Sequence, residues 1–457
     1  MLIRFTVSNF LSFRETTEFN MLTGNPRRLE HHVYKPGKGL ELIKMAAIYG
    51  ANGAGKSNLV KAMDYFHELT TSGEWVTPAK RKFRLDAGCA KLPASFEVEF
   101  VQDGKPYIYG VDLHDDYVGE EWLYESSLGS EDRIIFHRFT TAERQTRIDM
   151  ASRFVQQEED RYRVKFYAEN ELKDTELFFR KISGPKGPFE EIRQIFDWFR
   201  YKWVMIFPHS RPTGLLKGLL DDPQFSLFAK QFIGTLQTGI QELRVEKHGM
   251  AEFFGADDKE LADKLAEELL KPENKGGLGL YGSQGREELY ATLEQGKPVV
   301  NLLVTRHPDA QGNLFDFLPR EESDGTQRLL DLMPALYKAV REQATVVIDE
   351  MEQSIHPVLL KEVVRKFAGD DETKGQLIFT THEAHLLDQE YMRQDEYWFA
   401  EKSPAGTTSL IPLSDFKDIR YDLDLRKGYL VGRFGAVPFT GDLRHYNWDV
   451  YAEAANQ

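Results

Sequence analysis

The sequence is poor in several features that would assign it to a class of protein. A single cysteine, Cys89, excludes an internal disulfide framework and metal sites built from several cysteines, and it fits a reducing compartment. No apolar run approaches the roughly eighteen residues of a membrane-spanning helix, and the opening MLIRFTVSNF alternates like a strand instead of forming a signal-peptide core. These absences predict a soluble protein of the cytoplasm.

Basic residues are also in the minority. The 58 Lys and Arg residues against 73 Asp and Glu residues give a net charge of -15, which argues against a protein whose whole surface coats nucleic acid. A local basic excess occurs in residues 420–457, for which binding of a partner or nucleic acid and simple closure of the domain are equally open. The basic residues noted there are Arg420, Arg426, Lys427, Arg433 and Arg444.

The 457 residues exceed what one simple core usually holds, and hydropathy patterns divide them into five parts. Alternation in 3–7 and 17–21 predicts two adjacent strands, and 95–167 is typical of antiparallel hairpins that include RIIFHRF and RYRVKFY. Helical spacing dominates from 189 to 271, and 272–285, rich in Gly and Pro, predicts a loop. The expected parts are an N-terminal half of a core (1–94), a β-rich subdomain (95–188), a helical insertion (189–300), the second half of the core (301–419) and the basic C-terminal segment (420–457).

The octapeptide GANGAGKS at residues 50–57 is the most specific motif present. It fits G-x-x-x-x-G-K-[ST] and lies between an apolar segment, 44–49, expected to be a strand, and an amphipathic helix. Glycines let backbone N–H groups approach phosphate oxygens, and the following helix adds its positive end. Lys56 is expected to reach the β- and γ-phosphates of ATP and to act in catalysis, and Ser57 to bind Mg²⁺. The residues expected to bind the nucleotide are Gly50, Asn52, Gly53, Ala54, Gly55, Lys56, Ser57 and Asn58.

Polar residues end two further apolar runs, VVIDE at 346–350 and LIFTTHE at 377–383. If both runs are strands of one α/β sheet, their carboxyl ends meet where ligands bind. Asp349 then suits the Mg²⁺ shell, Glu350 suits polarisation of the attacking water, and His382 could hold the γ-phosphate or the water. Solvated acids and a structural histidine are the ordinary alternatives, but the nearby phosphate loop favours function.

A second sequence feature suited to binding an anion, a helix N-terminus, occurs late in the chain. Ser323 can cap that helix, and Gly325 lies in its first turn. Because one nucleotide already has its phosphate loop, a second such feature is explained if it covers a nucleotide bound by a neighbouring copy. Capping alone remains its ordinary meaning.

Other polar groups give weaker signals. His31 and His32 have no accompanying ligands and are expected at the surface. Asp422 and Asp424 follow no buried strand and are expected to be solvated acids.

Taken in order, these motifs resemble those of ABC-type ATPases: the phosphate loop, an S-x-G-x-x-R signature at 323–328, VVIDE, the short loop EQSIHP and the histidine of TTHE. The stretch NFLSF resembles the opening of RecF and SMC heads. The whole chain, including RKGYLVGRFGAVPF, resembles the compact ABC ATPases of prokaryotic abortive-infection and phage-defence systems of the RloA and AbiL kind, with PARIS AriA, Septu PtuA and OLD ATPases as relatives. This implies an α/β P-loop NTPase fold of the ABC-ATPase head type, with a mixed sheet, an antiparallel β-subdomain and a helical insertion.

The resemblance also implies a homodimer, or a higher homo-oligomer, that sandwiches two ATP molecules head to tail. Ser323 and Gly325 would contact the γ-phosphate in trans, Glu350 would be the base and His382 the switch. Two departures stand out: Asp324 occupies a position where glycine is usual, and IFPHSRP at 206–212 offers His209 and Ser210 where a glutamine is expected.

The predicted function is that of an ATPase acting as sensor or motor of a defence module that controls a separate nuclease or toxin, triggered by nucleic acid or a phage protein, with no membrane partner. A RecF-like repair ATPase that binds DNA is the first alternative, disfavoured by the acidic balance. A scaffold that binds ATP with little turnover is the second, disfavoured by the intact Asp349–Glu350 pair. A transporter subunit is less favoured still.

Overall fold

The computed structural model describes residues 1–24, 28–37, 39–127, 131–184, 189–211, 214–274, 276–281 and 287–437. The end of the basic C-terminal segment, with Arg444, lies outside the described residues, as does part of the predicted loop 272–285. Within the described ranges, no helix combines the length and apolar character needed to cross a membrane.

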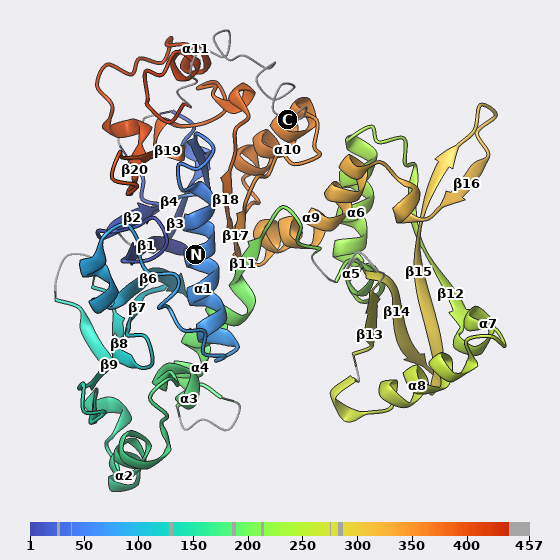
Figure 1. The fold of residues 1–457 in the computed structure, drawn as a ribbon. Coiled ribbons are helices and arrows are strands. Elements are labelled where there is room, and N and C mark those ends of the chain that lie inside the picture. The colour runs from blue at the N-terminus through green and yellow to red at the C-terminus, as the bar shows by residue number, and fades with distance from the viewer. Residues whose placement is uncertain are drawn as a thin grey trace, which may run out of the picture.

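A six-stranded sheet forms the centre of the protein (Figure 1). Across the sheet its strands are β11 (Trp203–Ile206), β17 (Thr345–Ile348), β18 (Gln376–Thr380), β5 (Met45–Gly50), β19 (Tyr397–Lys402) and β20 (Thr408–Pro412). The first five are parallel, and β20 runs antiparallel to β19. Strands β5, β17 and β18 are buried along their whole length, as their continuous apolar runs require. Only β18 separates β5 from β17, so the polar residues that follow these three strands emerge at one edge of the sheet.

Alternate residues of a strand point to opposite faces of the sheet. Because the apolar residues of these strands are buried on both faces, a layer of structure covers each face. Ile48 packs in one core with α1 (Lys56–Thr71) and with the second large sheet. Its neighbour Tyr49 packs in the other core, with α9 (Asp324–Arg341) and α10 (Pro357–Gly369). The expected α/β fold class, with the phosphate loop between a buried strand and a helix, is therefore confirmed.

The second large sheet is antiparallel and lies beyond α1. In order across it are β10 (Thr146–Met150), β9 (Arg133–Thr140), β8 (Val118–Glu125), β7 (Lys105–Leu113), β6 (Ala94–Gln102), β1 (Leu2–Ser8) and β2 (Thr17–Asn20). The predicted pairing of the first two strands is correct, and the turn at Asp103 and Gly104 has positive φ at both residues, as a tight hairpin requires. A separate small hairpin joins β3 (Val33–Gly37) to β4 (Leu40–Ile43).

One expected strand of this region is a helix. All of RYRVKFY but its last residue belongs to α2 (Glu158–Phe166), which buries only Val164. Acidic residues fill its first turn and basic residues its last, the arrangement that complements a helix dipole. The alternation of Tyr162, Val164 and Phe166 therefore has no sheet face to meet, and β10 ends the sheet instead. The short helices α3 (Phe178–Ile182) and α4 (Glu190–Asp197) follow and pack on the same core.

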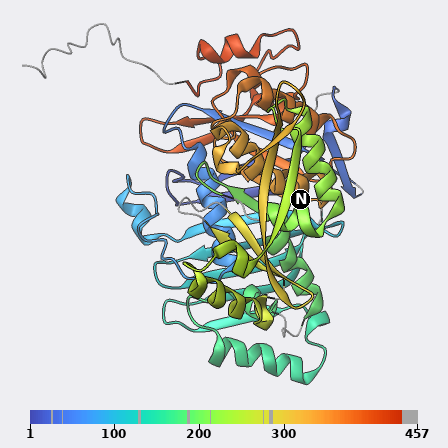
Figure 2. The ribbon, with the colours of Figure 1, turned by 90° about the vertical axis from the view of Figure 1, so that its right-hand side faces the viewer.

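The described residues between 215 and 317 build a second lobe (Figure 1), which faces the viewer in Figure 2. The expected helical insertion, 189–300, holds α5 (Leu215–Asp221), α6 (Pro223–Thr235), α7 (Met250–Phe254) and α8 (Lys259–Leu269), but it also holds strands β12 (Glu242–Gly249), β13 (Leu278–Tyr281) and β14 (Glu287–Glu294). Its first part, with α4 and β11, belongs to the main body instead. Together with β15 (Lys297–Pro308) and β16 (Leu314–Phe317) these form a third sheet, in which β13 occupies part of the predicted loop. The prediction missed β12 because its eight residues bury only Leu243 and half of them are charged. One face of α9, with Leu330, Met333 and Tyr337, packs on the lobe. The opposite face packs in the core that holds β17, so the helix links the lobe to the central sheet.

Candidate nucleotide-binding site

The phosphate loop, residues 50–57, leaves the edge of the central sheet at the end of β5. Gly53 and Gly55 have φ of 80° and 111°, a region in which other residues are strained. Gly50 pairs with Ala400 of β19, and an added Cβ would lie 2.8 Å from the Ala400 carbonyl oxygen. Asn52 and Gly53 are exposed, whereas Ala54 is buried. The glycines therefore serve both the turn itself and its close fit against β19.

Lys56 begins α1 and is buried. Its Nζ donates hydrogen bonds to the carbonyl oxygens of Gly50 at 2.8 Å and Ala51 at 3.4 Å, and it lies 2.9 Å from Nε2 of His382. Because Nζ is a donor, Nε2 accepts and the neutral ring carries its proton on Nδ1. The structure thus brings together two candidate residues that are 326 positions apart.

The electrostatics of this pair follow from burial. Burial lowers the pKa of Lys56 to about 8, against the opposing attraction of three acids, of which Glu352 is the strongest. Desolvation also lowers the pKa of His382, and the nearby Lys56 charge lowers it further. The charged form of Lys56 is thus destabilised by burial, beside a neutral histidine. The negative charge of a bound phosphate would stabilise it.

A carboxylate and hydroxyl cluster lies next to the lysine. The buried Asp349, directly after β17, accepts hydrogen bonds at Oδ1 from Ser57 Oγ at 3.0 Å and from Thr380 Oγ1 at 2.6 Å. Hydroxyl and carboxylate oxygens are the donors that Mg²⁺ prefers, and in phosphate sites it typically takes few protein ligands because phosphates and water supply the rest. The described residues contain no cluster of three or more His, Cys, Asp or Glu that could hold a metal alone. Ser57 and Asp349 fit a metal that is shared with a phosphate.

Glu350 follows in a strained conformation. Its φ is 51°, in the left-handed region that costs a non-glycine residue about 1 kcal/mol. The hydroxyl of Thr380 accepts a hydrogen bond from the Glu350 N–H at 2.8 Å and so holds the turn. The side chain is half-buried. Strain that is maintained in this way is common where a site needs one side chain in a fixed place.

The structure adds Glu352, which the sequence analysis did not select. Its Oε1 accepts a hydrogen bond from the backbone N–H of His382 at 2.6 Å. Burial raises the pKa of this carboxyl group. Its place two residues after Glu350 was the available signal, but only the tertiary structure brings it against His382.

Ser323 and Gly325 lie at the start of α9. Ser323 caps the helix by accepting the Thr326 N–H at 3.2 Å, and it is exposed. A Cβ on Gly325 would lie 2.6 Å from the carbonyl oxygen of Ser354 in the loop after Glu350, so glycine is needed for packing within the chain. No hydrogen bond in the described parts of the chain joins either residue to the phosphate loop.

The loop after β11 is attached to the same helix. Arg328, the last residue of the signature and a buried one, donates to the carbonyl oxygens of Phe207 at 3.3 Å and Ser210 at 3.2 Å. The hydroxyl of Ser210 accepts the N–H of Phe207, while His209 is exposed. Neither candidate for the missing glutamine contacts the phosphate loop through a hydrogen bond within the described chain.

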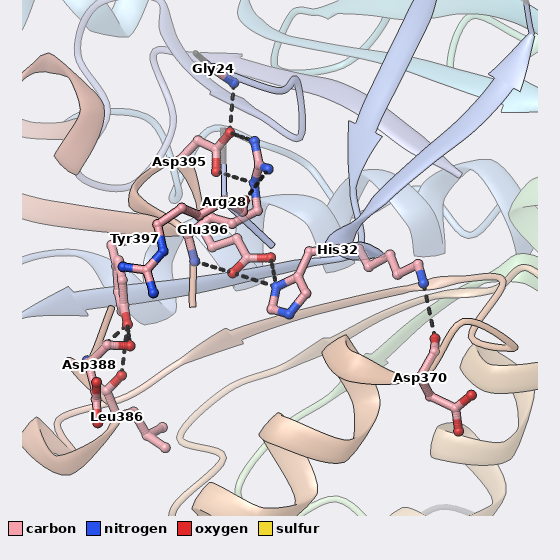
Figure 3. A network of polar contacts seen from close by, with 11 residues as sticks. Gly24, Arg28, His32, Asp370, Leu386, Asp388, Asp395, Glu396 and Tyr397 are labelled. Atoms are coloured by element: carbon pink, nitrogen blue, oxygen red, sulfur yellow. Dashed lines mark hydrogen bonds and ion pairs between the residues drawn. The ribbon is translucent and has the colours of Figure 1, made fainter. Parts of the chain in front are cut away.

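One of the two histidines expected at the surface is buried. His32 lies with Nδ1 at 2.9 Å from Glu396 Oε1, and both side chains are almost fully buried (Figure 3). Next to them Asp395 accepts hydrogen bonds from Arg393 and from the N–H of Gly24. The partners are some 364 positions away in the sequence, so no local pattern revealed them. The network joins Gly24 and His32 to the residues just before β19 and takes no part in the phosphate site.

The remaining expectations for isolated polar groups are correct. His31, Asp422 and Asp424 are exposed. Asp424 caps the short helix α11 (Leu425–Leu430) by accepting the N–H of Lys427 at 2.8 Å.

The affinity for the ATP expected at this site should fall as the pH rises above about 8. Lys56 has a pKa of about 8 in the unliganded protein, and a triphosphate binds its charged form preferentially. Below this pH the ammonium is present and affinity should be constant, whereas above it affinity should fall by up to about tenfold per pH unit. ATP titrations from about pH 7 to about pH 9.5 measure this dependence. Lys56→Arg stays charged and should lack it; equal pH dependence in both proteins would contradict the role of Lys56.

Comparison with known proteins gives a family and a loose structural likeness. The SMC head domain from Thermotoga maritima is 12% identical, with 90% of this chain and 98% of that chain covered, and the SmcHead bound to the C-winged helix domain of ScpA is 11% identical, with 90% and 96% covered. Both have a TM-score of 0.40. No curated protein matches the chain. The model of the family described as "AAA domain, putative AbiEii toxin, Type IV TA system" matches residues 45–388, from the strand before the phosphate loop to beyond His382, and the chain belongs to this family.

Proposed function

We propose that the protein binds ATP with Mg²⁺ at residues 50–58 and hydrolyses it to ADP and phosphate. The observation that carries this proposal is the meeting of Lys56 with His382 and of Ser57 with Asp349 at one edge of the central sheet. A phosphate loop without these partners could be a glycine-rich turn. With His382 and Asp349 beside it, the loop becomes a site in which cationic, metal-binding and hydrogen-bonding groups converge.

The side chains divide the work of phosphoryl transfer. The loop N–H groups and Lys56 bind the phosphates and offset charge that develops on the γ-phosphate. Ser57 and Asp349 hold Mg²⁺, which neutralises phosphate charge when bound. Glu350 orients the attacking water and accepts its proton. His382, fixed through its backbone by Glu352, contacts the γ-phosphate side of the site.

We further propose that the site is completed by a second copy of the chain. Ser323 is an exposed helix cap at the positive end of an 18-residue helix, with no hydrogen bond to the phosphate loop of its own chain among the described residues. Such an end favours anions. The neighbouring Asp324 is exposed and adds negative charge, so closure of two copies around ATP depends on the phosphates being neutralised by Lys56 and the metal.

Ser323→Arg tests the composite site. ATP binding at one site per chain should remain close to that of the parent, because the substitution leaves residues 50–58 unchanged. Closure of two copies should fail, and hydrolysis should fall by about tenfold or more for a bulky side chain placed in the interface. Calorimetry measures ATP binding, light scattering with ATP measures whether two copies associate, and phosphate release measures hydrolysis. Normal hydrolysis by Ser323→Arg would contradict the composite site.

For the wider role, we propose that ATP-dependent closure controls a separate nuclease or toxin in a defence module. The family description, which refers to a toxin–antitoxin system, supports a setting of this kind. A DNA-binding repair ATPase is the alternative. A net charge of -15 disfavours DNA binding over a broad surface, whereas the basic residues from 420 on would favour a local contact with DNA.

A pull-down with the Glu350→Gln variant, from the native host with ATP and Mg²⁺, separates these readings. A nuclease or toxin recovered in fixed proportion, and lost with Lys56→Ala as bait, would support control of an effector. Recovery of DNA alone, released by salt, would favour the repair ATPase.

A further inference from the structure

A chain of buried polar groups underlies the phosphate loop and is supplied by parts of the sequence far from it. Thr408, the first residue of β20, lies with Oγ1 at 2.8 Å from the carbonyl oxygen of Ala54 and at 2.7 Å from Oγ of Ser12. Asn58 Nδ2, in the first turn of α1, donates to the same Ser12 Oγ at 2.8 Å. Thr408, Ser12 and Ala54 are each at most 5% exposed.

The direction of these hydrogen bonds follows from the chemistry of the ends. A carbonyl oxygen only accepts, so Thr408 Oγ1 donates to Ala54; Thr408 is also the donor toward Ser12 Oγ, so its hydroxyl proton is shared between two acceptors. An amide nitrogen only donates, so Ser12 Oγ accepts from Asn58 as well. Every group has a partner, and the network joins Asn58, Ser12, Thr408 and Ala54. Such a fully satisfied buried network stabilises one arrangement of its members.

Steric fit adds a second observation. A Cβ on Gly55 would lie 2.1 Å from Thr408 Oγ1, which means that Thr408 occupies the space beneath the loop's last glycine. Thr408 is itself held, since its N–H donates to the Ser12 carbonyl oxygen at 2.8 Å. Ser12 belongs to the loop between β1 and β2, and the Asn9 side chain in that loop donates to the Cys89 carbonyl oxygen at 2.8 Å. The phosphate loop therefore rests on a support built from three separate segments.

On the basis of the proposed ATP binding, we propose that Thr408 is a positioning residue that holds residues 54–55 in the conformation that binds phosphate. It contacts no phosphate and acts through the Ala54 carbonyl and the packing of Gly55. Without its hydroxyl, the buried Ala54 carbonyl oxygen loses this donor, and the loop spends less time in the binding conformation. Apparent ATP affinity falls in proportion to that loss.

Thr408→Val removes the hydroxyl and preserves the shape, and calorimetric titration of the full chain with ATP and Mg²⁺ measures the effect. Affinity should fall by about tenfold in Thr408→Val and stay within about twofold in Thr408→Ser, which restores the donor. Ser12→Ala leaves the bond between Thr408 and Ala54 intact, and its ATP affinity should fall by about threefold. This variant tests the same network if Thr408→Val does not fold.

Thr70→Val is the matched control. Thr70 lies on the same helix, is fully buried and donates to the Phe66 carbonyl oxygen at 2.7 Å, away from the phosphate loop. It should lower the melting temperature of the unliganded protein without changing ATP affinity. Parent-like affinity in Thr408→Val, or an equal loss in Thr70→Val, would overturn the positioning role while leaving ATP binding by the parent intact. Failure of the parent itself to bind ATP would instead overturn the proposed function, and this inference with it.

Discussion

Lys56→Ala is expected to weaken ATP binding by about a hundredfold or more and to abolish hydrolysis. Lys56 is the buried cation at the start of α1, and its Nζ already lies within hydrogen-bonding distance of two loop carbonyls and of His382. Charge-assisted bonds to phosphate are each worth about 1.5–3 kcal/mol, so losing two of them accounts for an effect of this size. Calorimetric titration with ATP and Mg²⁺ measures binding, and phosphate release measures hydrolysis.

Measuring the free energy of unfolding of Lys56→Ala checks that the loss of binding does not come from a loss of folding. Lys56 has a lower pKa when folded, about 8, than its ordinary 10.5, so below about pH 8 its charge opposes folding and the opposition disappears as the pH rises toward 10.5. At pH 7 the free energy of unfolding of unliganded Lys56→Ala is therefore not expected to fall. The exposed Lys61 on the same helix gives the matched control, Lys61→Ala, which should bind as the parent does. Equal ATP affinity in Lys56→Ala and the parent would refute the phosphate-loop assignment.

Glu350→Gln should lower the rate of hydrolysis by about 10²- to 10⁴-fold while preserving ATP binding. The amide has the shape of the carboxylate but cannot accept the proton of the attacking water. Because ATP then persists, ATP-bound assemblies of two copies should accumulate. Single-turnover phosphate release measures the chemical step, and size-exclusion chromatography with ATP and Mg²⁺ measures the assembly.

Two other glutamates help to locate the effect. Glu362→Gln, at an exposed position of α10, should leave the rate unchanged. Glu352→Gln keeps an oxygen that can accept the His382 N–H and should cost less than Glu350→Gln. If Glu352→Gln lost hydrolysis while Glu350→Gln hydrolysed ATP at the parent rate, the role of base would pass to Glu352.

Local pattern was a good guide wherever burial imposes a simple period. The continuous apolar runs before Gly50, Asp349 and Thr381 predict strands buried on both faces, and all three are adjacent members of the central sheet. Order along the sheet then places Lys56, Asp349 and His382 at one edge. Pattern was a poor guide where burial is slight: β12, with one buried residue, was missed, and α2, with one buried residue, was mistaken for a strand.

Contacts between distant segments were beyond the reach of any local pattern. His32 looked like a surface residue because its partner Glu396 follows 364 positions later. Thr408 had no motif around it, yet it touches Ala54 across 354 positions. Gly325 matched a signature for contacting a phosphate, and the structure shows a further reason for glycine, the close approach of the Ser354 carbonyl.

The sequence by itself determined the phosphate loop, the two strands that deliver Asp349 and His382 and the α/β class, because glycine-dependent backbone geometry and two-sided burial each leave a short, regular pattern. Only the tertiary structure decided which groups support that loop: Thr380 beneath Asp349 and Glu350, Glu352 behind His382, and Ser12 with Thr408 beneath Ala54 and Gly55. These contacts are single hydrogen bonds and single steric fits between segments brought together by folding. They repeat with no period along the chain, so the packed structure alone assigns them.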